Sequence, residues 1–293
     1  MNNLLKMEKW KLLTIPFDSE KHHVLQLQHL AVQYIALTGR YLIPPGNDET
    51  NIAMQYLPEQ ELLIGKQHPD GWLVSLQLRK LILQIRDDNM TVKSEIDLEG
   101  QSFPEALIEF KKELHSVTGA DVSLIRTEQP YELPEISDDE GLFFNKGSQD
   151  AVFANIKYRN NANLVLNEVR AGYTETSPLL VWPNHFDTGF SFPVEHSQEG
   201  KTTKTIGVGW AIPDKVIDEP YYYISLHSDG EVEKQPDPED LPYGEWMMPE
   251  WNGAVLRHSD IIAETDSEKQ KLKVKRFLET GVKLMVEHFK ISH

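Results

Sequence analysis

The spacing of apolar residues along this chain changes from helical to strand-like and back to helical, and this series occurs twice. Apolar residues first recur at helical spacing, then give way to extended runs rich in branched and aromatic residues, and then return to helical spacing. Short turn-forming segments separate the extended runs, which favours antiparallel pairing. The sequence therefore predicts an α+β protein with two similar halves, each a largely antiparallel sheet flanked by helices in the order helix, strands, helix. No letter-by-letter similarity links the halves, so an internal duplication is inferred from element order alone.

The first half begins with a helix that should end at Gly39, a plausible left-handed cap. A capping box formed by Ser102 and Glu105 should begin its second helix. Between these helices, one long apolar run switches its parity, which indicates a bulge or bend near Arg79 and Lys80. The expected strands of this half are residues 51–57, 61–66, 72–87 and 91–98.

The second half begins with a helical stripe from Ala154 to Val169, which should stop at Gly172. A closing helix is expected from Val274 to Phe289. The strands expected between them are residues 179–192, 203–212, 221–227 and 253–258.

Two acidic, proline-bearing segments interrupt these patterns. Residues 128–140 carry six acids and no base, and residues 227–250 carry eight acids against one lysine. Solvated loops explain such a composition, although the second segment could also act as a lid over a ligand. We therefore expect domains at 20–127 and 147–290, joined by an acidic linker at 128–146.

Charge and cysteine content exclude several classes of protein. The formal net charge of −17 argues against binding to the phosphates of nucleic acids. The chain has no cysteine, so disulfides, thiolate metal clusters and a thiol nucleophile are excluded. Neither a signal peptide nor a membrane-spanning run is recognisable, which predicts a soluble, cytoplasmic protein without a membrane partner. The sequence points to no cofactor and leaves the oligomeric state open.

The segment "SPLLVWPNHFDTGFSFP" contains the first candidate site. If residues 185–192 form a strand, His185 and Asp187 share one face, opposite an apolar face of Phe186, Thr188, Phe190 and Phe192. A histidine and a carboxylate at this spacing could bind a divalent ion, or act as a base and its orienting group. A third ligand would have to come from elsewhere, with His196, His227, Glu195 and Glu245 as candidates. A solvated polar face is the simpler interpretation.

Two further sets of side chains could line a ligand site. Arg159, Asn163, Asn167 and Arg170 share one helix face, which should be solvated unless it lines a cavity for a carboxylate or phosphate. Aromatic side chains on the expected strands could stack on a ligand, although filling the core is the more usual role. This aromatic set comprises Trp182, Trp210, Tyr221, Tyr223, Trp246 and Trp251.

Three apparent motifs fail when their context is considered. "EGKTT" lacks the first glycine and the following helix of a phosphate-binding loop, so it is better explained as a hairpin turn. "GVGWAI" lacks the third glycine of a dinucleotide fingerprint, and Gly207 with Gly209 instead predicts one thin face of a strand. "GFSFP" has Pro193 where a nucleophile elbow needs glycine, which argues against a serine hydrolase built on Ser191.

The order of "SPLLVWPNHFD", "TKTIGVGWAIP", "PYYYISL" and "GEWMMPEWNGAVL" is similar to a family of bacterial proteins of unknown function and comparable length. The resemblance covers about residues 177–256. It implies a bacterial source and no particular chemistry. In this family a glycine-containing turn precedes the Phe-Asp pair, so the resemblance also implies that His185 is not a family-wide catalytic group.

These observations leave two main hypotheses for function. The first is a non-enzymatic protein that binds a small ligand or a partner, with a pocket between the halves lined by His185, Asp187, Trp182, Trp210, Glu245 and Arg159. The second is a metal-assisted hydrolase that uses His185 and Asp187 with a third ligand.

Overall fold

The computed structural model describes residues 9–45, 50–127, 131, 143–145, 147–228, 241–248 and 251–288. It confirms the α+β class, with two antiparallel sheets flanked by helices. The chain forms two compact units and passes from one to the other at several points, one of them inside a helix after Ile156 and none of them in the segment 128–146. The first unit comprises Asp18–Ile156 and Leu180–Asp187, and the second comprises Met1–Phe17, Lys157–Leu179 and Thr188–His293.

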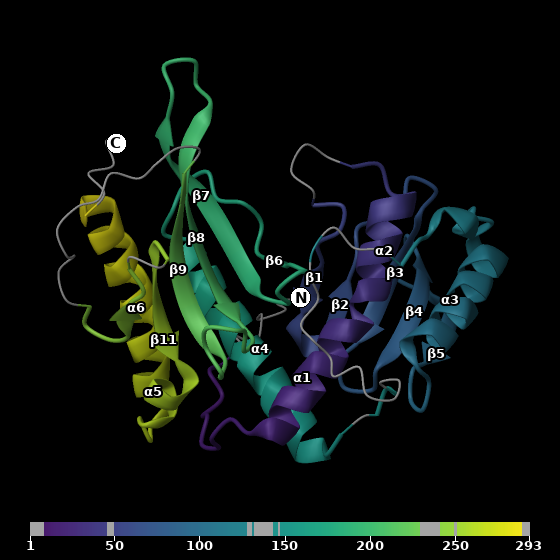
Figure 1. The fold of residues 1–293 in the computed structure, drawn as a ribbon, viewed down its shortest axis with the longest axis horizontal. Coiled ribbons are helices and arrows are strands. Elements are labelled where there is room, and N and C mark those ends of the chain that lie inside the picture. The colour runs from purple at the N-terminus through teal and green to yellow at the C-terminus, as the bar shows by residue number, and fades with distance from the viewer. Residues whose placement is uncertain are drawn as a thin grey trace, which may run out of the picture. The chain divides into compact units, whose positions relative to one another are not determined.

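The first unit contains a five-stranded antiparallel sheet in the order β1-β2-β3-β4-β5 (Figure 1). Each strand pairs with the next along the chain, as expected for a meander joined by short turns. Its elements are α1 (Ser19–Ala31), α2 (Gln33–Leu42), β1 (Gln55–Leu57), a 3-10 turn (Pro58–Gln60), β2 (Leu62–Ile64), β3 (Trp72–Gln77), β4 (Ile82–Asp87), β5 (Val92–Asp97), α3 (Phe103–Thr118), a 3-10 turn (Val122–Leu124) and β6 (Leu180–Val181).

Helix ends in the first unit follow the sequence signals in one case and depart from them in another. The capping box of Ser102 and Glu105 begins α3, and Gly119 ends it with a φ of 72°. Gly39, in contrast, lies inside α2 and is not its cap. The helix continues to Leu42 and ends where Ile43 adopts an extended conformation. A residue before proline favours this conformation, and Pro44 follows Ile43.

The long apolar run at 72–87 forms two strands joined by a hairpin, rather than one bent strand. β3 and β4 pair antiparallel, with Gln77 opposite Ile82, so the parity switch at Arg79 and Lys80 marks a turn. Leu81 closes this turn with a φ of 51°. A four-residue connection changes parity just as a bulge does, so the apolar pattern alone could not separate the two.

Most of the predicted linker at 128–146 lies outside the described residues. Its end, however, belongs to the first unit: Phe143 bridges to Ser102, and the Phe144 side chain is fully buried. The ring of Phe144 lies 6.3 Å from that of Tyr34 on α2. This end of the segment therefore contributes to a hydrophobic core instead of connecting two cores.

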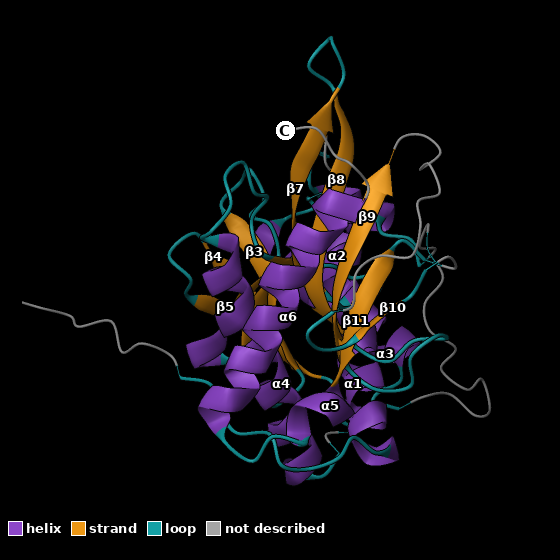
Figure 2. Ribbon diagram, turned by 90° about the vertical axis from the view of Figure 1, so that its left-hand side faces the viewer, coloured by secondary structure: helices purple, strands orange, loops and turns teal. Residues whose placement is uncertain are grey.

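The second unit contains antiparallel strands in the order β10-β11-β9-β8-β7 (Figure 2). α6 packs on β9 and β11, and its buried stripe includes the predicted Val274, Phe277 and Leu278. The predicted Phe289 lies outside the described residues. The elements are α4 (Gln149–Arg170), which crosses the unit boundary, β7 (Thr188–His196), β8 (Thr202–Ala211), β9 (Tyr221–Ser228), β10 (Glu245–Trp246), β11 (Gly253–Arg257), α5 (His258–Ile262) and α6 (Ser267–His288). None of the described helices is long and apolar enough to cross a membrane.

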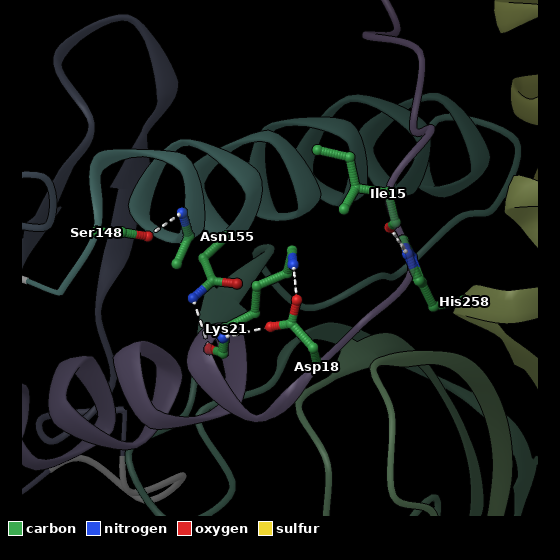
Figure 3. A network of polar contacts seen from close by, with 7 residues as sticks. Ile15, Asp18, Lys21, Ser148, Asn155 and His258 are labelled. Atoms are coloured by element: carbon green, nitrogen blue, oxygen red, sulfur yellow. Dashed lines mark hydrogen bonds and ion pairs between the residues drawn. The ribbon is translucent and has the colours of Figure 1, made fainter.

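Polar contacts fix the first turn of α1 and the start of the second unit (Figure 3). In the first unit, Asp18 caps α1 by accepting from the Lys21 amide at 3.0 Å and pairs with the buried Lys21 ammonium. Asn155 donates to the Lys21 carbonyl at 2.9 Å. In the second unit, His258 Nε2 donates to the Ile15 carbonyl at 3.0 Å.

Replacing Asp18 with asparagine should make the stability of the protein less sensitive to acid. The hydrogen bond from the Lys21 side chain lowers the pKa of Asp18 below its usual 3.8. The stabilisation is therefore fully present above about pH 4 and is lost as pH falls through the depressed pKa. Urea unfolding of the wild type and Asp18→Asn should differ at neutral pH and converge in acid, because asparagine keeps the cap but not the charge. An equal difference at every pH would contradict this assignment.

Candidate functional site

The segment that contains His185 and Asp187 forms a tight turn, not the expected strand. Residues 183–185 are a turn, and the Trp182 amide donates to the Asp187 carbonyl at 3.0 Å across it. Phe186 has a φ of 51°, which a pleated strand does not allow. Regular pairing begins only at Thr188 in β7. The predicted alternation is therefore wrong at Phe186 and holds from Thr188 onward.

This turn separates the two groups of the proposed pair. His185 is exposed, whereas Asp187 is 9% exposed. The Phe186 ring is fully buried and stacks on His29 of α1, with ring centroids 5.5 Å apart and planes within 7°. Burial of the ring was predicted correctly, but the left-handed backbone at Phe186 removes the common face that His185 and Asp187 needed.

Two buried polar side chains hold the turn in place. His29 Nε2 donates to the Pro183 carbonyl at 2.7 Å, and the Gln33 amide donates to the same oxygen at 2.9 Å. The Tyr131 hydroxyl donates to Gln33 Oε1 at 2.9 Å. His29 and Gln33 were not among the predicted site residues, although a histidine and a glutamine four residues apart inside an apolar stripe need partners when they are buried.

The described residues do not supply the third metal ligand that the hydrolase hypothesis needs. His196, His227 and Glu245 are each exposed, on β7, β9 and β10. Within the described ranges, no three histidine, aspartate or glutamate side chains are arranged to hold a metal ion. Glu245 instead accepts from Arg257 Nε at 3.0 Å and Nη2 at 2.8 Å.

The polar face of α4 is buried at Arg159, exposed at Asn167 and half-buried at Arg170. Arg159 is 1% exposed, donates from Nη1 to Thr188 Oγ1 at 2.8 Å, and lies 5.1 Å above the Trp210 ring. Asn167 is exposed, as expected. Trp210 belongs to the core and Trp182 is half-buried. The solvated interpretation is therefore wrong for Arg159, because sheet residues cover that part of the helix.

A small cavity in the second unit lies beside Trp210. Tyr158, Tyr222 and His258 help to line it, and the Tyr158 and His258 rings meet edge to face at 4.6 Å. Burial raises the pKa of Tyr222 well above its usual value, so its hydroxyl stays neutral. The cavity volume is about 10 Å³, which is room for about one water molecule and not for an organic ligand.

The more promising site is one face of the sheet in the second unit. Strand pairing places Gly207 opposite Ser225 and Gly209 opposite Tyr223, so these residues share a face. Gly253 of β11 lies opposite Ser225 on the other side of β9 and joins the same face. We call this surface the ring face; it comprises Gly207, Gly209, Tyr223, Ser225, His227, Trp251 and Gly253.

Rings lie against the glycines of the ring face. A Cβ atom at Gly209 would stand 2.5 Å from Tyr223 Cζ, and one at Gly253 would stand 2.8 Å from the indole of Trp251. Tyr223 and Trp251 are half-buried, so each packs on the sheet and is still partly open to solvent. A side chain at either position would lift a ring off the sheet, and at Gly253 it would also meet the Ile224 carbonyl at 2.7 Å. Glycine is therefore required at both positions.

Polar groups border these rings. Ser225 Oγ lies 3.1 Å from His227 Nε2, and a Cβ at Gly207 would come within 2.9 Å of that hydroxyl. A serine and a histidine at this distance resemble a nucleophile and its base. The backbone amides of β8 and β9, however, pair with each other along the ladder, so they do not point out of the sheet to stabilise an oxyanion. The arrangement suits binding better than acyl transfer.

Searches against protein-family models, curated proteins and solved structures each returned no match. The fold and the ring face thus define an α+β protein with a candidate binding surface on one sheet. Its resemblance to a bacterial family of unknown function stays a prediction.

The components of the ring face were predicted from the sequence, but not their assembly. Gly207 and Gly209 were expected on one thin strand face, and Tyr223 and Trp251 in the core or at its rim. The pairing of the tyrosine with one of those glycines was not predicted. A signal was present, because an aromatic residue directly opposite a glycine often covers it.

Proposed function

We propose that this protein binds a small organic molecule against the Tyr223 and Trp251 rings of the ring face. The observation that supports this most directly is the packing of two half-open rings against Gly209 and Gly253. Glycines at these positions give no packing of their own and weaken a strand. A partly exposed aromatic surface that requires such destabilising glycines is typical of a recognition site.

The surrounding groups favour binding without catalysis. The exposed His227 provides a hydrogen-bonding group at one edge of the rings, where its Nε2 lies 3.1 Å from the hydroxyl of the buried Ser225. Glu245 with Arg257 provides a charged pair at another edge. A few polar groups around aromatic walls orient a ligand. A cytoplasmic location, a pocket between the halves and an internal duplication stay predictions. Residues 229–240 and 249–250, which include most of the predicted lid, lie outside the described residues.

Alanine at Tyr223 or Trp251 should weaken ligand binding about tenfold or more, as truncation of an aromatic anchor usually does. The ligand would first be found by thermal-shift screening of the purified protein against ring-containing and amine-containing metabolites. Isothermal titration calorimetry with the best compound would then compare the wild type with the two variants.

Trp246→Ala is the matched control. Trp246 of β10 is also half-buried, but it pairs with Ala254 of β11 and so lies on the opposite face of the sheet from Glu245. We expect this variant to keep the affinity of the wild type. A ligand whose affinity responds to Trp246→Ala and not to Tyr223→Ala would move the binding site away from the ring face.

A further inference from the structure

We infer that the ring face recognises a cation, specifically a small ammonium group carrying methyl groups. This inference rests on the proposed function and specifies the chemical class of its ligand. It follows from the angle between the rings and from the charge around them.

The rings of the ring face are tilted against each other. The centroids of Tyr223 and Trp251 lie 6.3 Å apart and their planes meet at 57°. Tyr221, the neighbour of Tyr223 on the same side of β9, is inclined to it by 58° at 6.4 Å. A flat ligand can stack on only one of two planes inclined in this way. A roughly spherical methylated ammonium group can contact both, and the negative faces of aromatic rings attract such cations.

The charge of the chain also favours a cation. The formal net charge of −17 draws cations towards the protein and repels anions. Among the described residues of β8 to β11, those with a fixed charge on the same side of the sheet as the ring face are Glu245 and Arg257. These two residues bind each other. An anion would therefore have to displace Glu245 from Arg257. A cation over the rings would leave the pair of Glu245 and Arg257 intact.

An NMR titration of the full chain tests this inference. The probes are tetramethylammonium, choline and 3,3-dimethylbutan-1-ol, in which carbon replaces the charged nitrogen of choline. We expect both ammonium ions to shift the Trp251 indole resonance and the Gly209 and Gly253 amides. They should bind about tenfold more tightly than the neutral alcohol, since cation–π contacts with two rings contribute about that much.

Conservative variants keep the test independent of folding. Tyr223→Phe and Trp251→Phe retain a ring and should retain the ammonium affinity, whereas Tyr223→Leu and Trp251→Leu should lose about tenfold. Equal binding of the neutral alcohol would overturn the cation inference and leave the proposed function standing. If neither ammonium ion binds while another compound binds at the ring face, the cation inference is likewise overturned and the proposed function still stands. Ammonium binding that is unaffected by the leucine variants would overturn the inference.

Discussion

Replacing Phe186 with alanine should lower the free energy of unfolding by about 3–5 kcal/mol, the usual cost of removing a buried phenyl ring. The Phe186 ring is fully buried and stacks on His29, so its removal leaves a cavity beside the turn. The same turn depends on the hydrogen bonds of His29 and Gln33 to the Pro183 carbonyl. Urea unfolding monitored by circular dichroism measures this change.

Glycine at the same position separates the backbone effect from the packing effect. With a φ of 51°, alanine at 186 should cost about 1 kcal/mol more than glycine, because its Cβ disfavours the left-handed region. Phe186→Gly should therefore be more stable than Phe186→Ala.

Phe190 is the matched control, because it is 3% exposed and lies within the regular strand β7. In a strand glycine is the less favourable residue, so Phe190→Gly should be less stable than Phe190→Ala. The same order of the two substitutions at both positions would contradict the left-handed backbone at Phe186.

Replacing Gly39 with alanine should destabilise the protein by about 3 kcal/mol, a cost at the upper end for overpacking a core. In an ordinary helix this change would be favourable by about 0.5–1 kcal/mol. At Gly39, however, a Cβ would overlap the backbone carbonyl of Asn51, and the side-chain amide of Asn51 already donates from Nδ2 to the Gly39 carbonyl at 2.8 Å. To make room for the methyl group, the backbone of α2 at Gly39 and the backbone at Asn51 would have to move apart. Thermal and urea unfolding would show the loss.

Gly119→Ala provides the comparison. This glycine ends α3 with a φ of 72°, and a Cβ there meets no other atom. Its replacement should cost only about 1 kcal/mol, from the backbone conformation alone. A Gly39→Ala protein as stable as the wild type would show that Asn51 does not approach Gly39 as closely as described.

Much of the fold could be predicted because local patterns report it. Helical spacing from Ala154 to Val169 identified α4, and the capping box of Ser102 and Glu105 located the start of α3. The run 203–212 was placed correctly as a strand, now β8. Each of these signals depends on residues within a few positions of one another, so the sequence contains the whole of the relevant interaction.

The candidate site was less accessible to the same reasoning. The sequence showed Tyr223, Gly207 and Gly209, but not that β9 aligns the tyrosine opposite Gly209. A shift of one residue in strand register would have placed the ring on the opposite face of the sheet. Register is decided by packing along the whole strand, so the ring face became recognisable only from the pairing of complete strands.

By itself, the sequence determined the alternation of helices and strands, the antiparallel α+β class, the strongly acidic charge and the absence of thiol chemistry. Only the tertiary structure decided where the chain turns at Phe186, where Asn51 lies against Gly39 of α2 and which rings cover which glycines. Phe186 adopts a left-handed conformation in a turn held by His29, a residue 154 positions before Pro183. Such contacts join residues that are distant along the chain, so no local pattern records them.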